Sequence, residues 1–451
     1  MPTILELYQK AFAKDLELAE IANQLFPDGV THDSRYMSPF PIYITHAEGA
    51  QKWGLDDQSF IDYWSGHGAL LLGHNPPEIV DAVTTQIHRG THYGACHPLE
   101  LEWGNLITQL IPSAERVRFV SSGTEATLMA IRLARTYTQK KKVLKFEGHF
   151  HGWHDNLIMG AHKPYNAPIP GVPQEIMDTT ILSPPNDIDA VEKILKEDEE
   201  IACVILEPTG ASFGTIPTNG EFLQQLRELT LDYGVVLIFD EVITGFRVAP
   251  GGAQGYYNVI PDLTTLAKIV AGGLPGGALV GKEEILDLIS TDAEADGMKM
   301  PHPGTFNANP LSASAGIAML KIVKTGKPHE QANLMGQKLR DELNQVIDSY
   351  KLDWVIYGEF SGIRLLVGHG EKDIRAVDFD PYIWDYRKLK ENSDSELLIS
   401  LRCGLLLNGI DLACNGGMTT AAHSDADITK TVEAFERVIG WMRDDGLILK
   451  S

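Results

Sequence analysis

The chain has 451 residues, enough to bury a large core either as one α/β unit or as two to three domains. Its formal net charge of −23 argues against nucleic acid or an anionic membrane as a partner, because both repel an acidic protein. A composition of 43% hydrophobic and 22% charged residues is typical of a globular protein, and no signal peptide or membrane span is evident. The four cysteines are widely spaced without a CxxC pair, which favours reduced thiols and a cytoplasmic location.

The first hundred residues predict a helix, a small meander and two further helices. Apolar residues recur at helical spacing over residues 3–26, which predicts one leading helix. Short apolar pieces within 42–64 then indicate antiparallel strands. Amphipathic helices are expected at 79–88 and 99–111.

A strand at 117–120 runs into a turn of small residues and a long helix. Ser122, Gly123 and Thr124 place backbone amides and hydroxyls at the start of that helix, where the helix dipole favours an anion. Taken alone, an ordinary capped helix is the more probable interpretation, because serine and threonine are good N-caps. A phosphate site becomes the better interpretation only together with the residues described next.

The segment after the strand at 143–146 carries three histidines, His149, His151 and His154. They suggest zinc, but no downstream residue supplies an obvious further ligand, so we expect no metal. The Pro- and Gly-rich stretch 161–174 is expected to be a mobile loop over the site.

Two buried strands end in carboxylates. The apolar run 235–239 is typical of a strand buried on both faces of a parallel sheet, and Asp240 and Glu241 follow it. In open α/β sheets the ligand crevice lies at the carboxyl ends of the strands. Glu207 follows the strand at 201–206 in the same way. It is expected to hold Asp240 or a substrate group in place, or equally to orient the pocket.

Lys268 follows a strand-like piece at 263–266 and precedes Gly272 and Gly273. A lysine between apolar residues and a glycine turn is poorly solvated, which lowers its pKa and suits an amine that forms a Schiff base. An acid at a strand end together with such a lysine is the pair that pyridoxal phosphate (PLP) requires, with the acid keeping the pyridine nitrogen protonated. The alternative is a structural acid and a solvated lysine.

The C-terminal part has a different character from residue 328 onward. We expect a long helix, a strand, a mostly helical segment and a terminal helix at 329–351, 363–367, 384–408 and 431–445. The expected domains are 1–70 (an N-terminal helix and meander that belong to a small domain), 71–325 (a large cofactor-binding domain) and 326–451 (the α+β remainder of the small domain).

Four stretches closely resemble the class III aminotransferases: SSGTEATLMAIRLAR, FEGHFHGWHD, LIFDEVITGFRVAPGGAQGYYNVIPDLTTLAK and GTFNANPLSASAG. Within that family the chain is most similar to the glutamate-1-semialdehyde aminomutase group. The resemblance implies the α/β fold of fold-type-I PLP enzymes: a large domain around a mostly parallel central sheet, and a smaller α+β domain from both chain ends. It also implies PLP as cofactor.

The resemblance assigns roles to individual residues. It implies a Schiff base at Lys268, a pyridinium contact from Asp240, and Val242 and Phe150 on the two faces of the ring. It implies phosphate contacts from Ser122, Gly123, Thr124 and Thr305, and substrate contacts from Arg35, His67 and Ser212. In this family the segment around Thr305 is donated to the neighbouring subunit, so the resemblance implies a homodimer with shared active sites.

Several positions depart from the aminomutase pattern. Asn415 stands where that group has a glutamate, Ser212 where an asparagine is expected, and His67 where a tryptophan lines the pocket. We therefore expect an aminotransferase that moves an amino group between an amine or a β/ω-amino acid and a 2-oxo acid. The alternative is intramolecular amino transfer, as in glutamate-1-semialdehyde 2,1-aminomutase. A lyase, a racemase or a non-catalytic binding protein on the same fold are weaker alternatives.

Overall fold

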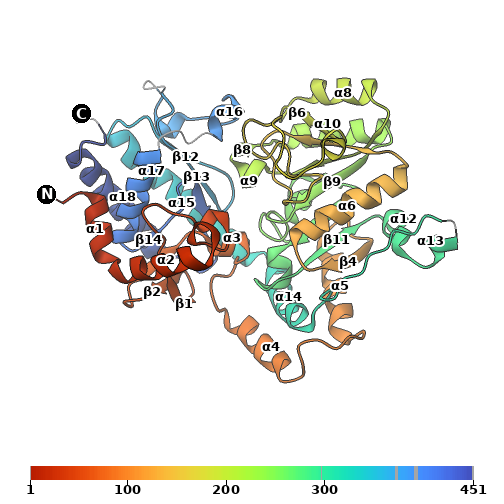
Figure 1. Cartoon of the computed structure of the whole chain (residues 1–451), viewed down its shortest axis with the longest axis horizontal. Helices are drawn as coiled ribbons and strands as arrows, with labels where there is room; N and C mark the ends of the chain where they lie inside the picture. Colours follow the sequence, from red (N-terminus) through yellow and green to blue (C-terminus); the bar gives the residue numbers. More distant parts are fainter. Residues whose placement is uncertain (1, 296, 371–373, 391–394, 449–451) are drawn as a thin grey trace. The chain divides into compact units, whose positions relative to one another are not determined.

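The computed structural model (Figure 1) describes residues 2–295, 297–370, 374–390 and 395–448. The chain divides into two compact units. The large unit comprises Gly68–Leu71 and Pro77–His329, and the small unit comprises Met1–His67, Leu72–Pro76 and Glu330–Ser451. Both ends of the chain therefore contribute to the small unit.

A seven-stranded sheet lies at the centre of the large unit. Its strands are β4 (Arg116–Val120), β5 (Lys142–Phe146), β6 (Thr180–Ser183), β7 (Ile201–Leu206), β9 (Val236–Glu241), β10 (Leu263–Ala267) and β11 (Gly277–Gly281), in the order β4-β11-β10-β9-β7-β5-β6. The pairs among β10, β9, β7, β5 and β6 are parallel, and β11 is antiparallel to β10 and to β4. A mostly parallel sheet flanked by helices confirms the predicted α/β fold.

Helices and short segments connect these strands. They are α4 (Pro77–Ile87), α5 (Pro98–Leu110), α6 (Gly123–Thr138), α7 (Gln174–Met177), α8 (Ile188–Glu197), α9 (Ala211–Gly214), β8 (Ile216–Pro217), α10 (Gly220–Asp232), α11 (Gly252–Tyr257), η3 (Lys268–Ala271), α12 (Glu283–Leu286), η4 (Asp287–Ile289), α13 (Asp292–Ala295) and α14 (Pro310–Val323).

Both faces of the large sheet are covered, which explains why β9 reads as an unbroken apolar run. Val236 and Ile238 pack with α6 in one hydrophobic cluster, whereas Leu237 and Phe239 pack with α8 and α10 in another. Because successive side chains of a strand point to opposite faces, a strand buried on both sides needs apolar residues at every position. The apolar run in the sequence is therefore the direct result of covering both faces.

The small unit contains two small sheets and several helices. Its elements are α1 (Ile4–Ala11), α2 (Ala13–Leu25), η1 (Pro27–Gly29), η2 (Asp33–Arg35), β1 (Ile44–Glu48), β2 (Gln51–Gly54), β3 (Ser59–Asp62), α3 (Ser65–Gly68), α15 (Lys327–Ser349), β12 (Val355–Tyr357), β13 (Gly362–Leu366), η5 (Ala376–Asp378), α16 (Tyr386–Leu389), α17 (Ser395–Leu407), β14 (Ile410–Asp411), β15 (Gly416–Met418) and α18 (Asp425–Asp444). Two of these helices reach into the large unit: the last residue of α3, Gly68, and the first three residues of α15, 327–329, belong to it. The sheets have the orders β1-β2-β3-β14 and β12-β13-β15. Since β3 pairs in parallel with β14, strands from opposite ends of the chain lie side by side.

One helix prediction differs from the structure, and a second, the mostly helical segment 384–408, agrees with it. The single helix expected at 3–26 is interrupted at Phe12, whose φ of −113° and ψ of 40° depart from helical values. The ring of Phe12 packs against Tyr8 and Phe60, with centroid distances of 4.7 and 6.1 Å, so tertiary packing accompanies the interruption. The expected helical segment 384–408 contains α16 and α17, while residues 391–394 lie outside the described residues.

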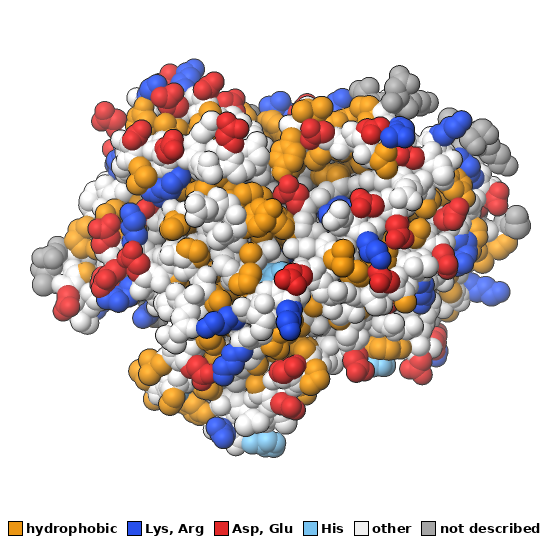
Figure 2. Space-filling view, turned by 180° about the vertical axis from the view of Figure 1, so that it is seen from behind, with side chains coloured by type: hydrophobic (Ala, Val, Ile, Leu, Met, Phe, Trp, Pro, Cys, Tyr) orange, Lys and Arg blue, Asp and Glu red, His pale blue; other side chains and the backbone are white. Residues whose placement is uncertain are grey.

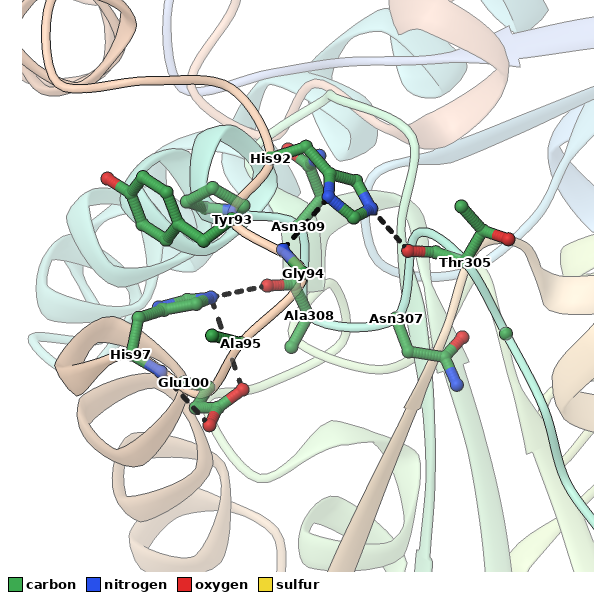
Figure 3. A pocket seen from close by; sticks show the side chains of 12 residues that line it. His92, Tyr93, Gly94, Ala95, His97, Glu100, Thr305, Asn307, Ala308 and Asn309 are labelled. Atoms are coloured by element: carbon green, nitrogen blue, oxygen red, sulfur yellow. Dashed lines mark hydrogen bonds and ion pairs between the residues drawn. The ribbon is translucent and has the colours of Figure 1, made fainter.

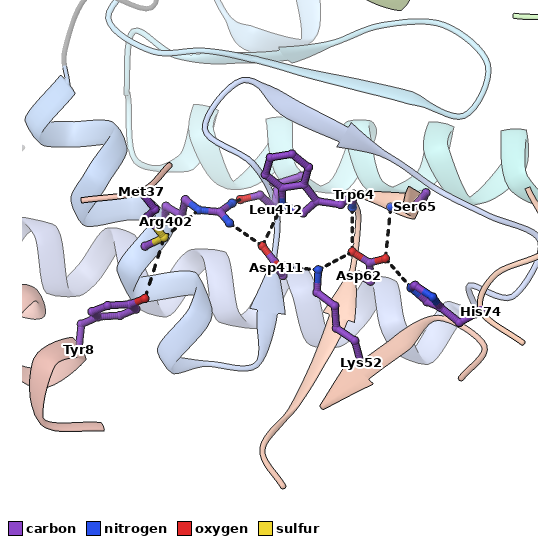
Figure 4. Close-up of polar contacts among 10 residues, drawn as sticks. All are labelled: Tyr8, Met37, Lys52, Asp62, Trp64, Ser65, His74, Arg402, Asp411 and Leu412. Carbon is purple, nitrogen blue, oxygen red and sulfur yellow. Dashed lines mark hydrogen bonds and ion pairs between the residues drawn. The ribbon is translucent and has the colours of Figure 1, made fainter. Parts of the chain in front are cut away.

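A buried ionic network joins the two chain ends within the small unit (Figure 4). Lys52 Nζ on β2 lies 2.9 Å from Asp62 Oδ1 on β3 and 2.6 Å from Asp411 Oδ2 on β14. Arg402 Nη2 on α17 donates to Asp411 Oδ1 at 2.9 Å, and His74 Nε2 lies 2.8 Å from Asp62 Oδ2. Both carboxylates are buried, and each forms ion pairs with two side chains. Removal of one carboxylate therefore leaves each of its two partners with one ion pair fewer.

Replacing Asp411 with asparagine is expected to destabilise the folded chain by about 3–5 kcal/mol, because Arg402 would lose its buried counter-charge and Lys52 would keep only Asp62. Burial alone raises the pKa of Asp411, but the charges of Lys52 and Arg402 hold it below its ordinary value. Urea unfolding of the wild type and the variant at neutral pH measures the difference. The control Asp56→Asn removes the exposed partner of Lys14 and should change the unfolding midpoint little. Equal midpoints for wild type and Asp411→Asn would contradict the prediction.

On the face seen in Figure 2, acidic and basic side chains are interspersed among hydrophobic ones, without one continuous basic area. Within the described part of the chain, each helix is too short or too polar to cross a membrane.

Candidate active site

The carboxyl ends of five strands meet at one edge of the large sheet. Strands β5, β7, β9 and β10 run in parallel, and β4 runs in the same direction as β10 because both are antiparallel to β11. This edge therefore gathers the residues at or after those strand ends: Ser122 after β4, Phe150 after β5, Glu207 after β7, Asp240 in β9 and Lys268 after β10.

Asp240 is held by three donors and is 5% exposed. His151 Nδ1 lies 2.7 Å from Oδ2, and Oδ1 accepts hydrogen bonds from Thr265 Oγ1 and from the Val242 amide, both at 3.1 Å. Burial raises the pKa of Asp240 to about 6, although the bonds from Val242 and Thr265 and the charge of Lys268 oppose the rise. At neutral pH the site therefore presents an oriented carboxylate that can pair with a protonated ring nitrogen.

Lys268 begins the turn η3 directly after β10. It adopts a φ of 56°, a left-handed conformation that residues other than glycine rarely adopt, so the turn determines where its side chain starts. No hydrogen bond or ion pair within the described residues involves its Nζ. Burial lowers the pKa of Lys268 to about 8, while the negative charges of Asp240 and Glu207 oppose the decrease. Near neutral pH a much larger fraction of this amine than of an ordinary lysine is therefore unprotonated and nucleophilic.

In the cofactor-free chain, the Lys268 amine is expected to titrate with a midpoint near pH 8. Its modification rate by trinitrobenzenesulfonate, followed by peptide mass spectrometry, should rise through that pH. The variant Asp240→Asn should lower the midpoint further, because the Asp240 charge favours the ammonium form. Exposed Lys14 serves as internal control, since its hydrogen bond to Asp56 raises its pKa. A Lys268 midpoint like that of an ordinary lysine would contradict this description of the site.

The turn at the start of α6 has the form of an anion site. Ser122 caps the helix, and its Oγ accepts a hydrogen bond from the Glu125 amide at 3.2 Å. A Cβ at Gly123 would lie 2.9 Å from both methyl groups of Val242, so only glycine lets this turn approach the end of β9. A Cβ at Gly152 would similarly meet Thr124 Oγ1 at 2.7 Å. The turn is therefore packed against the segments that carry Asp240 and Phe150.

Glu207 ties three segments together. Its Oε1 accepts a hydrogen bond from the Phe150 amide at 3.0 Å, and its Oε2 accepts one from the Phe213 amide at 3.4 Å. Its own amide donates to His149 Nδ1 at 3.1 Å. These bonds hold the backbone at Phe150 and the turn that contains Ser212, so the carboxylate orients the pocket wall. The Phe150 side chain is 44% exposed and thus available for stacking.

Thr305 lies elsewhere in the large unit, in a polar cavity of about 230 Å³ (Figure 3). The cavity is lined by parts of segments 92–100 and 304–310, and its lining includes neither the Ser122–Thr124 turn nor Asp240 nor Lys268. The described contacts within one chain therefore do not bring Thr305 to the other expected phosphate ligands.

Arg35 and His67 belong to the small unit. His67 has a φ of 56° and stacks on His32 with ring centroids 5.0 Å apart. Arg35 follows His32 in the same short turn and donates from Nη1 to Thr31 Oγ1 at 2.9 Å. The two expected substrate residues are thus linked through His32, and the role of each stays a prediction.

Two residues that hold Asp240 are not predicted from the sequence. His151 appears there only as a possible metal ligand, whereas in the structure it contacts Asp240. Among the described residues no group of three or more His, Cys, Asp or Glu is placed to hold a metal ion. Thr265 faces Asp240 across the parallel pair of β10 and β9. Only the alignment of these two strands could have identified Thr265 in advance.

The donor set fits pyridoxal phosphate. The oriented carboxylate of Asp240 suits a pyridinium nitrogen, and the helix start at Ser122 suits a phosphate group. The Lys268 amine has no partner within the described chain, as expected of a group reserved for the cofactor aldehyde.

Comparisons with known proteins agree with this fit. The family model described as "Aminotransferase class-III" matches residues 33–358. The glutamate-1-semialdehyde 2,1-aminomutase of Sulfurisphaera tokodaii is 40% identical over 427 residues, which cover 93% of this chain and 97% of that protein. An omega-transaminase from Sphaerobacter thermophilus has a similar structure, with a TM-score of 0.86, 30% identity and coverage of 95% of this chain and 98% of that one. A transaminase with bound PLP matches with a TM-score of 0.85, 29% identity and coverage of 97% and 99%.

A family match of this length, together with a relative at 40% identity over nearly the whole chain, confirms the resemblance seen in the sequence. The chain therefore belongs to the class III aminotransferase family, and its cofactor is pyridoxal phosphate.

Proposed function

We propose that this enzyme transfers an amino group by way of the pyridoxal and pyridoxamine forms of its cofactor. The observation that carries the proposal is the pairing, at one sheet edge, of a partner-free Lys268 with an oriented Asp240 carboxylate. When bound, the cofactor supplies an electron sink that stabilises negative charge on the substrate carbon.

Lys268 performs the proton transfers in this proposal. Its Nζ would hold the cofactor through the cofactor aldehyde. Once free, the same amine would accept and donate the proton that moves during amino transfer, as general base and general acid. A pKa near 8 suits both directions, because an amine of that pKa accepts and donates protons near neutral pH.

Asp240 keeps the cofactor ring in its reactive form. A carboxylate next to the ring nitrogen stabilises the protonated nitrogen, and the bonds from His151 and Thr265 hold that carboxylate in place. The Ser122–Thr124 turn would hold the phosphate group, and Val242 and Phe150 would contact the ring. Thr305 supplies a further phosphate contact to a second copy of the chain, so the proposed active form is a homodimer.

For the substrate, the curated relatives support intramolecular amino transfer. Relatives from Sulfurisphaera tokodaii and Methanopyrus kandleri, at 40% and 36% identity, both bear the name glutamate-1-semialdehyde 2,1-aminomutase. These names favour the aminomutase, which the sequence analysis gave as the alternative, over the external aminotransferase, which it gave first. We therefore propose glutamate-1-semialdehyde 2,1-aminomutase activity as the first candidate.

External transamination is the second candidate, because specific residues favour it. Asn415, Ser212 and His67 replace residues expected in the aminomutase group. The omega-transaminase from Sphaerobacter thermophilus shares 30% identity over almost the full length. An amine or a β/ω-amino acid would then be the donor and a 2-oxo acid the acceptor.

One assay separates the two candidates. The purified enzyme, loaded with pyridoxamine phosphate, is given glutamate-1-semialdehyde with no added amino acceptor. Catalytic formation of 5-aminolevulinate supports the aminomutase. Turnover of an amine donor only when pyruvate or 2-oxoglutarate is added supports the transaminase. Absence of either reaction and of any cofactor absorption change would refute the proposed function.

The proposed setting is the cytoplasm, with small-molecule amino and oxo compounds as substrates. Cys96, Cys203 and Cys403 are free thiols, which supports a reducing compartment.

A further inference from the structure

The turn that carries Thr305 is attached to a neighbouring segment by two histidines (Figure 3). His92 Nε2 lies 2.6 Å from the Thr305 carbonyl oxygen, and His97 Nε2 lies 2.9 Å from the Ala308 carbonyl oxygen. Asn309 Nδ2 donates to the Thr91 carbonyl at 2.8 Å. Hydrogen bonds from the neighbouring segment therefore hold the turn at Thr305 and again at Ala308 and Asn309.

The bonds around His92 define its tautomer. The Gly94 amide donates to Nδ1 of His92 at 3.2 Å, so Nδ1 acts as the acceptor and Nε2 carries the proton given to the Thr305 carbonyl. His97 lies just before helix α5, and its amide donates to Glu100 Oε1 at 3.3 Å. Each histidine is therefore positioned by its own segment before it binds the turn.

The histidine bonds determine the orientation of two peptide groups of the turn, Thr305–Phe306 and Ala308–Asn309. In a trans peptide the carbonyl and the following N–H point in opposite directions. When His92 holds the Thr305 carbonyl, the Phe306 N–H must point to the other side. The amides of Thr305 and Phe306 and the Thr305 hydroxyl make no hydrogen bond within the described residues. The turn therefore offers the Phe306 N–H, unpaired among the described residues, as a donor on the side opposite His92, while the histidines bind the Thr305 and Ala308 carbonyls.

We infer that His92 and His97 are positioning residues that orient the Thr305 turn to bind a phosphate monoester, the phosphate group of the cofactor of a second copy of the chain. This inference rests on the proposed function. A dianion is repelled by carbonyl oxygens and attracted by N–H and O–H donors. The histidines hold two carbonyls of the turn away from it, and the His92 bond leaves the Phe306 N–H facing the other way. Neither histidine contacts the phosphate; each acts through the turn.

The experiment compares two noncovalent ligands of the full-length dimer, pyridoxamine phosphate and pyridoxamine, which differ only in the phosphate group. In His92→Ala and in His97→Ala, pyridoxamine phosphate should bind about tenfold more weakly, as is typical when a residue that orients a ligand is lost. Pyridoxamine affinity should not change in either variant. The variants His92→Gln and His97→Gln keep an N–H donor and should recover most of the affinity.

A double-mutant cycle tests whether the histidines act through Thr305. Thr305→Ala alone should also weaken pyridoxamine phosphate selectively, and adding His92→Ala should cost little more, because the two changes remove one shared contact. His46→Ala is the control: His46 stacks on Trp53 in the small unit, and its loss should leave both affinities unchanged.

Three results would overturn the inference: equal loss of affinity for the two ligands, fully additive effects in the cycle, or no effect of Thr305→Ala. The proposed function is judged separately by the visible absorption of the bound cofactor in the wild type and in Lys268→Ala. A failed histidine experiment with that absorption intact would refute the positioning role alone.

Discussion

The variant Lys268→Ala is expected to lose turnover by about four orders of magnitude, because it removes both the amine that tethers the cofactor and the group that moves the proton. Lys268→Arg is the matched variant: it keeps the positive charge but lacks a nucleophilic amine, and it should be equally inactive. Turnover is measured with the substrate that the assay above identifies. The visible absorption of the bound cofactor should change in both variants.

The two variants also separate electrostatics from chemistry. If Lys268→Arg retained activity within tenfold of the wild type, charge alone would suffice and the assigned role of the amine would be wrong. Exogenous methylamine provides a further check, since a small amine that enters the space left in Lys268→Ala should restore part of the turnover.

The variant Asp240→Asn is expected to lower turnover by about a hundredfold to a thousandfold, as is found when a group that stabilises charge in the transition state is removed. Asparagine has nearly the same shape and keeps one acceptor oxygen, but it has no negative charge to hold the ring nitrogen protonated. Thr265→Val removes only one of the donors to the carboxylate and should have a much smaller effect.

The pH dependence gives a second test of Asp240. Because burial raises its pKa to about 6, the carboxylate is present above that pH and is lost as the pH falls through it. Cofactor affinity of the wild type should therefore decline on the acid side of about pH 6, and Asp240→Asn should lack this decline. An unchanged acid limb in the variant would assign the titration to another group.

Much of the large unit could be predicted because its strands carry local signals. The run before Asp240 is apolar at every position, and that pattern is typical of a strand whose two faces are both covered. The same strand places a carboxylate at its end, and Lys268 follows the next strand. These positions follow from the order of residues along the chain, which is read directly from the sequence.

Other elements gave weaker signals. Helix α14 is almost wholly buried and therefore lacks the polar face by which a surface helix is recognised. Helix α10 is not among the helices predicted from the sequence. The interruption at Phe12 likewise depends on a packing partner, Phe60, that is distant in the chain.

The sequence by itself determined the family, the fold class and the cofactor, because contiguous motifs such as the residues around Asp240 and Lys268 carry that information. Only the tertiary structure decided which side chains support those two residues. His151 and Thr265 reach Asp240, and His92 reaches the Thr305 turn, from segments between 25 and 213 residues away. Such contacts leave no local pattern, because hydrogen bonds between distant segments depend on strand register and packing rather than on spacing along the chain.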